Sequence, residues 1–302
     1  MEQALSARIL AAALLALPLL GAKAPPAAPA PDKTQVAWAE ACKGDDGWDT
    51  PGPPFRIHGN TWYVGTCGIA AILIRGKDGA VLIDSGTAKG SEIVEANIRS
   101  LGVRLDSVKA ILASHEHFDH VAGFARLQGL TGAPVLVGTE AAGVIRTGKD
   151  DPRDPQFGLH PPMAPVTGSV RGVKDGEALT LAGIKLTAIA TPGHTPGATS
   201  WSWRSCAGKD CRTIIYADSL NPISGDAYRF SDHADYVAAF RAGLARLRAA
   251  RCDILLTPHP GSSDMPARAR GGTMAGGMSC AQYADAKTKA LDDRLAKEAA
   301  AQ

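Results

Sequence analysis

Four potential metal ligands stand within six residues of one another: His115, His117, Asp119 and His120. They directly follow an apolar run that ends at Ala113. In an extended chain the side chains at positions 115, 117 and 119 point to one side, and position 120 turns inward where a helix begins. Imidazole and carboxylate groups together suit zinc, which binds nitrogen, sulfur and some oxygen ligands. The segment therefore predicts a zinc site at the end of a strand.

Two more histidines occupy similar positions later in the chain. His194 lies in Thr-Pro-Gly-His-Thr at 191–195 and His259 in Thr-Pro-His-Pro at 257–260, each just after a strand-like run. A lone histidine in such a turn is most often structural. Three strand-end sites in one chain favour a shared site instead, because strand ends can meet at one sheet edge. The remaining histidines lack paired ligands nearby, and we interpret them as structural or surface residues: His58, His160 and His233.

A shared site requires strands that end just before these ligands, and the hydrophobic pattern predicts such strands. Short apolar pieces separated by glycines predict an antiparallel meander over residues 54–84. Ser91 is predicted to cap a helix that runs to about Leu101. Further elements are expected in chain order: a buried strand at 108–113, a helix from about 119 and a strand at 133–137. Residues 147–165 are rich in Pro and Asp and predict a long surface loop, a kind of segment that is often functional.

The second half of the chain has a similar order of elements. We expect strands at 185–190, 199–204, 213–217 and 253–256, and helices at about 233–249 and 280–299. Two successive meanders, each followed by strands and helices, predict an α/β fold in which two sheets pack together with helices outside them.

Composition sets the class of protein and of partner. The 302 residues are 45% hydrophobic and 21% charged, which is ordinary globular usage and excludes a disordered, collagen-like or coiled-coil chain. The formal charge is +2, and no basic run interleaves with aromatic residues, so we expect no nucleic-acid partner. We expect a monomer, although no pattern in the sequence decides the oligomeric state.

The N-terminus is typical of an export signal. Arg8 precedes an apolar stretch at 9–20, which is too short to cross a bilayer that needs about 20 residues. No cysteine follows closely, so a lipid anchor or other stable membrane anchor is not expected. We predict a signal peptide at 1–24 with cleavage between 24 and 30, a Pro/Ala-rich linker at 25–31 and the folded domain at 32–302. This organisation predicts a periplasmic protein.

Cysteine usage agrees with export. An even number of cysteines in an exported chain favours disulfides, and six allow 15 pairings. The six are Cys42, Cys67, Cys206, Cys211, Cys252 and Cys280. Cys206 and Cys211 flank Ala-Gly-Lys-Asp between two strand-like runs, and we expect them to close a hairpin. No Cys-x-x-Cys pair is present in the sequence, which argues against a cysteine-based zinc finger.

The chain resembles the metallo-β-lactamase superfamily. The resemblance spans about 54–260 and consists of His-x-His-x-Asp-His at 115–120, Thr-Pro-Gly-His-Thr at 191–195 and the later strand-end His259. It implies an αββα four-layer sandwich with two mixed sheets and helices on the outer faces. It also implies two Zn²⁺ ions per chain, the first bound by His115, His117 and His194 and the second by Asp119, His120 and His259.

Further segments are similar to subclass B3 of that superfamily: residues 59–68, 216–220 and 256–260. Other β-lactamase subclasses would place a ligand cysteine near Ser219, where this chain has none. The resemblance extends to a group with three disulfides, which implies the pairs Cys42–Cys67, Cys206–Cys211 and Cys252–Cys280.

The resemblance implies an exported dizinc β-lactamase that gives antibiotic resistance. A zinc-bound hydroxide would attack the lactam amide of penicillins, cephalosporins and carbapenems, because zinc lowers the pKa of bound water to near 7. Asp119 is the expected catalytic residue, which would bind zinc and orient the hydroxide. Ser219, Asn221 and Gln156 are the expected substrate contacts, although a small hydroxyl residue is common in the family where Asn221 stands.

The alternative is a dizinc lactonase or thioesterase on the same fold. Such enzymes place a metal-bridging Asp near Asp218, whereas the subclass resemblance favours Ser219 facing the metals, with Asp218 turned away as a structural residue. A metal-bound histidine needs a partner on its other ring nitrogen, and Asp84 is a candidate for that role. Trp62 and Tyr63 form either a flap over the site or a packed strand pair.

Overall fold

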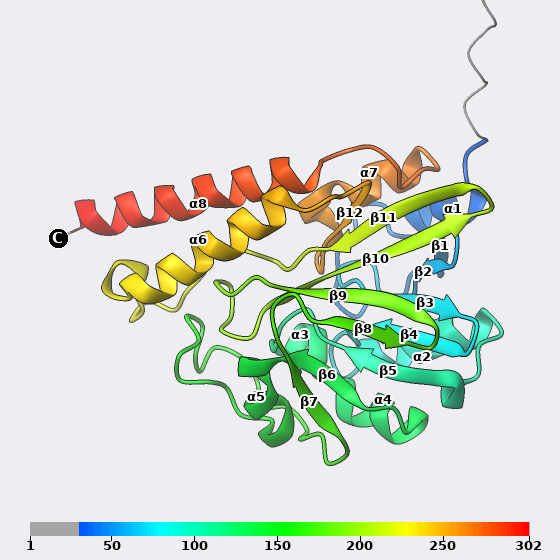
Figure 1. The fold of residues 1–302 in the computed structure, drawn as a ribbon, viewed down its shortest axis with the longest axis horizontal. Coiled ribbons are helices and arrows are strands. Elements are labelled where there is room, and N and C mark those ends of the chain that lie inside the picture. Colours follow the sequence, from blue (N-terminus) through cyan, green and yellow to red (C-terminus); the bar gives the residue numbers. More distant parts are fainter. Residues whose placement is uncertain (1–29, 302) are drawn as a thin grey trace, which may run out of the picture. The chain divides into compact units, whose positions relative to one another are not determined.

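Two mixed β-sheets lie at the centre of the fold in the computed structural model, which describes residues 30–301 (Figure 1). The larger sheet has the strands in sequence order: β1 Phe55–His58, β2 Thr61–Tyr63, β3 Ile72–Gly76, β4 Gly79–Ile83, β5 Val108–Leu112, β6 Val135–Gly138 and β7 Val170–Val173. Its first four strands are antiparallel, as the predicted meander requires, and β4 to β7 are parallel.

The smaller sheet comes from the second half of the chain. Its order is β12 Ile254–Leu256, β11 Asp210–Tyr216, β10 Thr199–Ala207, β9 Ile184–Ala190 and β8 Ala178–Leu181. Only β11 and β12 pair in parallel. Because β9 and β11 are both antiparallel to β10, the strands β9, β11 and β12 all run the same way and end at the same edge.

Alternation along the strands separates the layers. In β3, Ile72 and Ile74 face the core between the two sheets, while Leu73 faces the helices outside. In β11, Ile214 and Tyr216 face the same inner core, and Ile215 faces the opposite helical layer. Burial of each such side chain stabilises the fold by about 1.5–3 kcal/mol, so both faces of both sheets hold the layers together.

Helices cover the two outer faces (Figure 1). The layer on the larger sheet contains α2 Gly90–Ser100, α4 Phe124–Thr131 and α5 Ala142–Thr147, and that on the smaller sheet contains α6 Ala234–Ala249 and α8 Cys280–Ala300. Two short helices, α1 Lys33–Ala41 and α7 Met265–Arg270, add side chains to the inner core, and α3 Phe118–Val121 begins inside the ligand cluster. The predicted αββα four-layer sandwich is confirmed.

Several local expectations need revision. Ser91 lies inside α2 rather than at its cap, and the hydroxyl of Thr87 accepts the N–H of Gly90 at 2.8 Å instead. Tyr63 is fully buried within β2 beside the half-buried Trp62, so these residues form a strand pair and not a flap. The hydrophobic pattern does not predict α1, α5, α7, β7 or β8, which are short and flank the longer elements.

The three disulfides join the predicted pairs: Cys42–Cys67, Cys206–Cys211 and Cys252–Cys280. The predicted signal peptide and most of the predicted linker lie outside the described residues. Within residues 30–301, no helix has both the length and the apolar character needed to cross a membrane.

Candidate metal centre

The candidate ligands follow strands that end at one edge of the sandwich. His115 comes three residues after β5, His194 four residues after β9 and His259 three residues after β12. Two hydrogen bonds join the strand ends of the two sheets: Thr199 N–H donates to Ser114 O at 2.7 Å, and the indole N–H of Trp201 donates to Ala113 O at 2.8 Å. The sheet topology thus brings ligands from distant parts of the sequence together.

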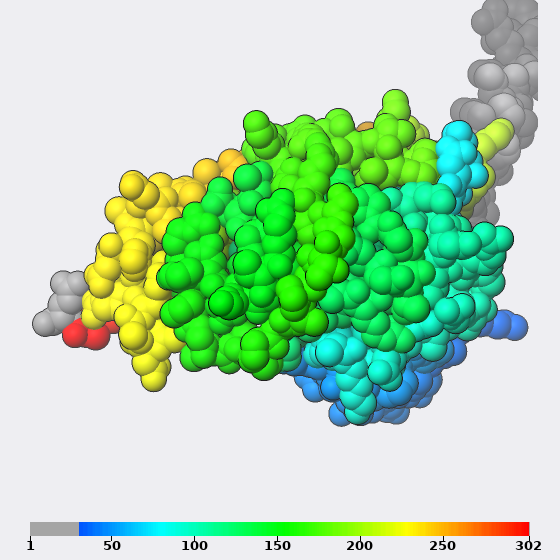
Figure 2. Space-filling model, turned by 90° about the horizontal axis from the view of Figure 1, so that it is seen from below, coloured from blue at the N-terminus to red at the C-terminus, as the bar shows by residue number. Residues whose placement is uncertain are grey.

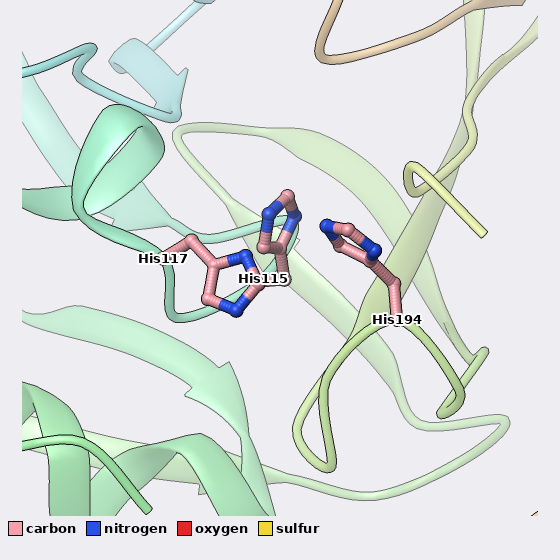
Figure 3. Close-up of side chains that lie close together, drawn as sticks. All are labelled: His115, His117 and His194. Atoms are coloured by element: carbon pink, nitrogen blue, oxygen red, sulfur yellow. The ribbon is translucent and has the colours of Figure 1, made fainter. Parts of the chain in front are cut away.

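Three histidines form a first set. One ring nitrogen each of His115, His117 and His194 lies within 4.8 Å of the others, and all three residues are buried. In Figure 3 the three rings point toward one another, two from the loop after β5 and one from the loop after β9. Such a cluster of nitrogens fits a single zinc ion.

Each histidine of the first set has a hydrogen-bond partner on its other ring nitrogen. His115 Nδ1 lies 2.7 Å from Asp218 Oδ1, and His117 Nε2 lies 2.9 Å from Asp154 Oδ2. His194 Nδ1 donates to the backbone oxygen of Asn221 at 3.0 Å. These contacts fix the tautomers and leave one nitrogen of each ring for a metal. His115 Nε2 is buried, and within the described residues it has no hydrogen-bond partner, as expected of an atom that binds a metal.

A second set of ligands lies next to the first. Asp119 Oδ2 is 3.0 Å from His120 Nε2 and 3.4 Å from His259 Nε2. His115 also lies within 4.8 Å of the ligand atoms of Asp119 and His120, so it borders both sets. Two adjacent cation sites, one with three imidazoles and one with two imidazoles and a carboxylate, fit these residues.

The electrostatics of the buried rings suit metal binding. Burial lowers the pKa of His115 and His117 well below the usual range, and it lowers that of His194 to about 3 and that of His259 to about 4. These imidazoles are therefore neutral at pH 7, which is the form that binds a metal.

Asp119 and His120 behave as a buried ion pair when no metal is present. Burial opposes both charges, yet each partner favours ionisation of the other, so the pKa of Asp119 is lowered and that of His120 is raised. A metal ion that binds both residues would displace the proton from His120, because only the neutral imidazole is a ligand.

Glu116 connects the two loops that carry the first set. Its side chain is buried and points away from the metal ligands, with one oxygen accepting from the Thr195 hydroxyl at 2.6 Å and the other from Gly197 N–H at 2.8 Å. Burial raises the pKa of Glu116 to about 7, although these hydrogen bonds oppose the shift. The carboxylate thereby holds His194, on the same turn, against His115 and His117.

Close packing shapes the turn that carries His194. Gly193 has φ +149°, and a Cβ there would lie 2.2 Å from the ring of Phe240 in α6. Only glycine fits between the metal loop and this helix. The Pro-Gly pair seen in the sequence therefore has a steric reason.

Asp84 supports the cluster from behind. Its carboxylate accepts Ser114 N–H, the Ser114 hydroxyl and the Tyr216 hydroxyl, each at 2.7 Å. Its distance to His120 Nδ1 is 3.6 Å, which is too long for a hydrogen bond. Asp84 therefore positions the residue just before the cluster rather than acting as the close partner of a ligand.

Asp218 lies behind the first set of candidate ligands. It is fully buried, and one of its carboxylate oxygens contacts His115 Nδ1 on the side of the ring opposite the ligand nitrogen. In this position its carboxylate holds the ring of His115 from behind. Ser219 is buried beside it, and within the described residues its hydroxyl has no hydrogen-bond partner.

The long loop, residues 148–169, places two side chains against His117. Asp154 contacts His117, and the ring of His160 lies with its centre 4.2 Å from that of His117, so His160 lies beside the site. Gln156 is buried, and its N–H donates to Asp154 Oδ1 at 2.7 Å. The many Asp residues of this loop indicate that it could carry a functional carboxylate. No spacing in the sequence, however, connects Asp154 with His117.

The loop also borders the segment after β11. Gly225 N–H donates to Pro155 O at 2.9 Å. Figure 2 shows the green surface around residue 150 next to the yellow surface around residue 230. The two loops are therefore neighbours in the folded chain.

An αββα sandwich with two adjacent imidazole and carboxylate sites defines a metal-dependent protein of hydrolase type. A profile of the Metallo-beta-lactamase superfamily matches residues 64–206. The solved MIM-2 metallo-beta-lactamase is 50% identical, with 89% of this chain and 100% of that chain covered and a TM-score of 0.84. The chain belongs to the metallo-β-lactamase superfamily.

Other solved structures agree. MIM-1 from Novosphingobium pentaromativorans is 46% identical, with 88% of this chain and 98% of that chain covered and a TM-score of 0.84. MEM-A1, a subclass B3 metallo-beta-lactamase from a soil metagenome library, is 39% identical, with 85% of this chain and 100% of that chain covered and a TM-score of 0.80.

A more distant similarity covers only part of the chain. Hydroxyacylglutathione hydrolase of Idiomarina loihiensis is 27% identical over 128 residues, which are 42% of this chain and 39% of that protein. The match therefore covers less than half of the length of this relative. The match to MIM-2 covers the whole of the MIM-2 chain.

Proposed function

We propose that the protein is an exported dizinc β-lactamase of subclass B3 that hydrolyses penicillins, cephalosporins and carbapenems in the periplasm. The observation that carries the proposal is the pair of adjacent ligand sets, which share a border at His115. The full-length similarity to MIM-2 and MEM-A1, both called metallo-beta-lactamases, supports the same substrate class.

The chain provides ligands for two metal ions. His115, His117 and His194 would hold the first, and Asp119, His120 and His259 the second. Zinc supplies Lewis acidity and a bound water whose pKa is near 7. Asp119, in its ionised form, presents a carboxylate that can accept a hydrogen bond from the attacking water and orient it toward the lactam carbonyl.

The surrounding residues restrict the chemistry. Asp218, Asp154 and the Asn221 carbonyl hold the first three rings in fixed orientations, which limits their reorganisation when charge develops in the reaction. The buried hydroxyl of Ser219 is free to donate to the substrate. Gln156 lies on the loop that carries the partner of His117, which agrees with a role in substrate contact.

A lactonase or thioesterase activity is not favoured. That alternative needs a bridging carboxylate, but Asp218 Oδ1 is engaged by His115 Nδ1 at 2.7 Å. The similarity to hydroxyacylglutathione hydrolase is also weaker and covers a smaller part of the chain than the similarity to the β-lactamases.

The test measures hydrolysis of a carbapenem and a chromogenic cephalosporin by purified protein, with and without a chelator, beside a metal count. We expect turnover that is lost on chelation and restored by zinc, at two metal ions per chain. Bound zinc without lactam turnover would reject the β-lactamase proposal. Light scattering of the same sample tests the expected monomer, and cell fractionation with N-terminal sequencing tests export.

A further inference from the structure

Lys287 is a half-buried cation on α8 that has no acidic partner within the described residues. Its ammonium group donates to Asn221 Oδ1 at 2.5 Å and lies 4.9 Å from the centre of the Tyr283 ring. Burial lowers the pKa of Lys287, although the charge of Asp218 opposes that shift. A partly desolvated ammonium held by one neutral oxygen has the capacity to bind an anion.

Lys287 is linked through its neighbours to residues of the candidate metal centre. Tyr283, one turn earlier on α8, donates its hydroxyl to Ser219 O at 2.7 Å and Asp218 O at 3.0 Å. Asn221, the partner of Lys287, accepts at its backbone oxygen from the ligand His194. The charge of Lys287 also contributes to the lowered pKa of His259. Lys287 therefore lies beside the metal ligands and not on the outer surface of the helix.

The polar groups around Lys287 offer donors rather than acceptors. The amide oxygen of Asn221 is taken by Lys287, which leaves its N–H₂ as a donor, and the buried Ser219 hydroxyl is free to donate. The nearest carboxylate, that of Asp218, is engaged by His115. An ammonium, an amide N–H₂ and a hydroxyl together form a site for a carboxylate.

We propose that Lys287 is a specificity-determining residue that binds the carboxylate of the substrate, together with Asn221 and Ser219. The inference rests on the proposed function, because penicillins, cephalosporins and carbapenems carry a carboxylate beside the lactam nitrogen. It also gives Asn221 a role: its side chain reaches α8, which a smaller hydroxyl residue at that position would not do.

The test compares an acid with its neutral ester. Binding of mercaptoacetic acid and of its methyl ester to the zinc-loaded protein is measured by calorimetry in the wild type, in Lys287→Gln and in Lys289→Gln. Glutamine at 287 keeps an N–H donor, has a shorter side chain and removes the charge. Lys289 is a matched control, since it lies on the same helix but is exposed and paired with Asp293 at 2.5 Å.

We expect Lys287→Gln to bind the acid about tenfold more weakly, a change of about 1.4 kcal/mol, and the ester unchanged, because the variant loses a charge-assisted hydrogen bond to the carboxylate. Lys289→Gln should behave as the wild type. With a penicillin and its methyl ester as substrates, the same change should raise KM for the acid about tenfold and leave kcat and the ester kinetics unchanged.

An acid-to-ester affinity ratio that is the same in Lys287→Gln and the wild type overturns the proposal, as does an equal loss in Lys289→Gln. Failure of the wild type to hydrolyse any lactam would reject the proposed function instead. In that case the calorimetry still decides whether Lys287 binds a carboxylate, because it needs no turnover.

Discussion

The two ligand sets differ in how the protein holds them. The rings of the first set are almost fully buried, and each has a hydrogen-bond partner behind it. In the second set His259 keeps 32% of its side-chain surface exposed, and its ring lies 6.1 Å from that of Trp48, itself 42% exposed. The first set is therefore preorganised by buried polar contacts, whereas the second is open on one side.

Disulfides hold the segments around the more exposed second set. Cys252–Cys280 joins the residues just before β12, the strand that leads to His259, to the start of α8. Cys42–Cys67 closes the segment that carries Trp48. A covalent link restricts the unfolded chain and fixes an exposed segment without needing a dry interior. One cluster of metal ligands can thus be held by buried hydrogen bonds on one side and by crosslinks on the other.

The largest expected effect is the loss of activity when a histidine ligand is removed, and the number of metal ions retained distinguishes the two sets. His117→Ala should lower lactam hydrolysis by more than about 1000-fold, since a metal ion supplies several kcal/mol of transition-state stabilisation. The variant should remain folded by circular dichroism and lose one metal ion. His259→Ala is the matched change in the second set, and it should keep the first metal ion. The comparison fails if His259→Ala loses both ions while His117→Ala keeps both.

Removing a crosslink should have the next largest effect. The double change Cys252→Ser and Cys280→Ser opens a link between positions 28 residues apart, so the chain-entropy relation gives a loss of about 3.5 kcal/mol in the free energy of unfolding. The same change at Cys206 and Cys211, which are 5 residues apart, should cost about 2 kcal/mol. Denaturant unfolding measures both. Zinc titration should show weakened binding only for the first pair, because only that pair supports His259.

The sequence predicts the ligands better than the groups that hold them. His115, His117 and Asp119 fall in one short segment, and His194 follows a strand in a Pro-Gly turn, so local patterns are sufficient to find them. The longer strands and helices are predicted for the same reason, because alternation and helical periodicity are local, whereas short elements such as β7 and β8 are not. The cap prediction at Ser91 is wrong because α2 already begins at Gly90, whose N–H is accepted by the hydroxyl of Thr87.

The supporting contacts depend on the folded chain. Asp154 meets His117 across 37 residues, and Lys287 meets Asn221 across 66 residues. No periodicity or spacing in the sequence connects such pairs, since they depend on how loops pack. His160 was interpreted as structural or surface for the same reason, because its loop position gives no hint of the ring of His117 beside it.

A pH experiment sharpens the view that buried polar contacts hold the first set. The pKa of Glu116 is about 7 in the folded chain, above its ordinary value of 4.5, so folding favours the protonated form. Its stabilising contribution is complete below pH 4.5 and is lost as the pH rises through 7. We therefore expect the metal-free wild type to lose about 2 kcal/mol relative to Glu116→Gln between pH 5 and pH 8.

Denaturant unfolding of both metal-free proteins across this range provides the measurement. The difference between them isolates Glu116 from the neighbouring histidines, whose lowered pKa values act in the opposite direction and are common to both proteins. A difference that does not change with pH would mean that the pKa of Glu116 is not raised in the fold.

The smallest effect concerns a single contact behind a ligand. Asp218→Asn keeps the shape of the residue that meets His115 Nδ1 at 2.7 Å but removes its charge. We expect zinc affinity at the first set to fall about tenfold, the lower end of the range for such partners, because an amide oxygen can still accept the hydrogen bond. Asp285→Asn is the control, since Asp285 is exposed on α8 and pairs with Arg248. Competition with a chelator measures both variants. If Asp218 instead bridged two metals, its replacement would also weaken the second site. One ion would then be lost, and the metal count would fall to one.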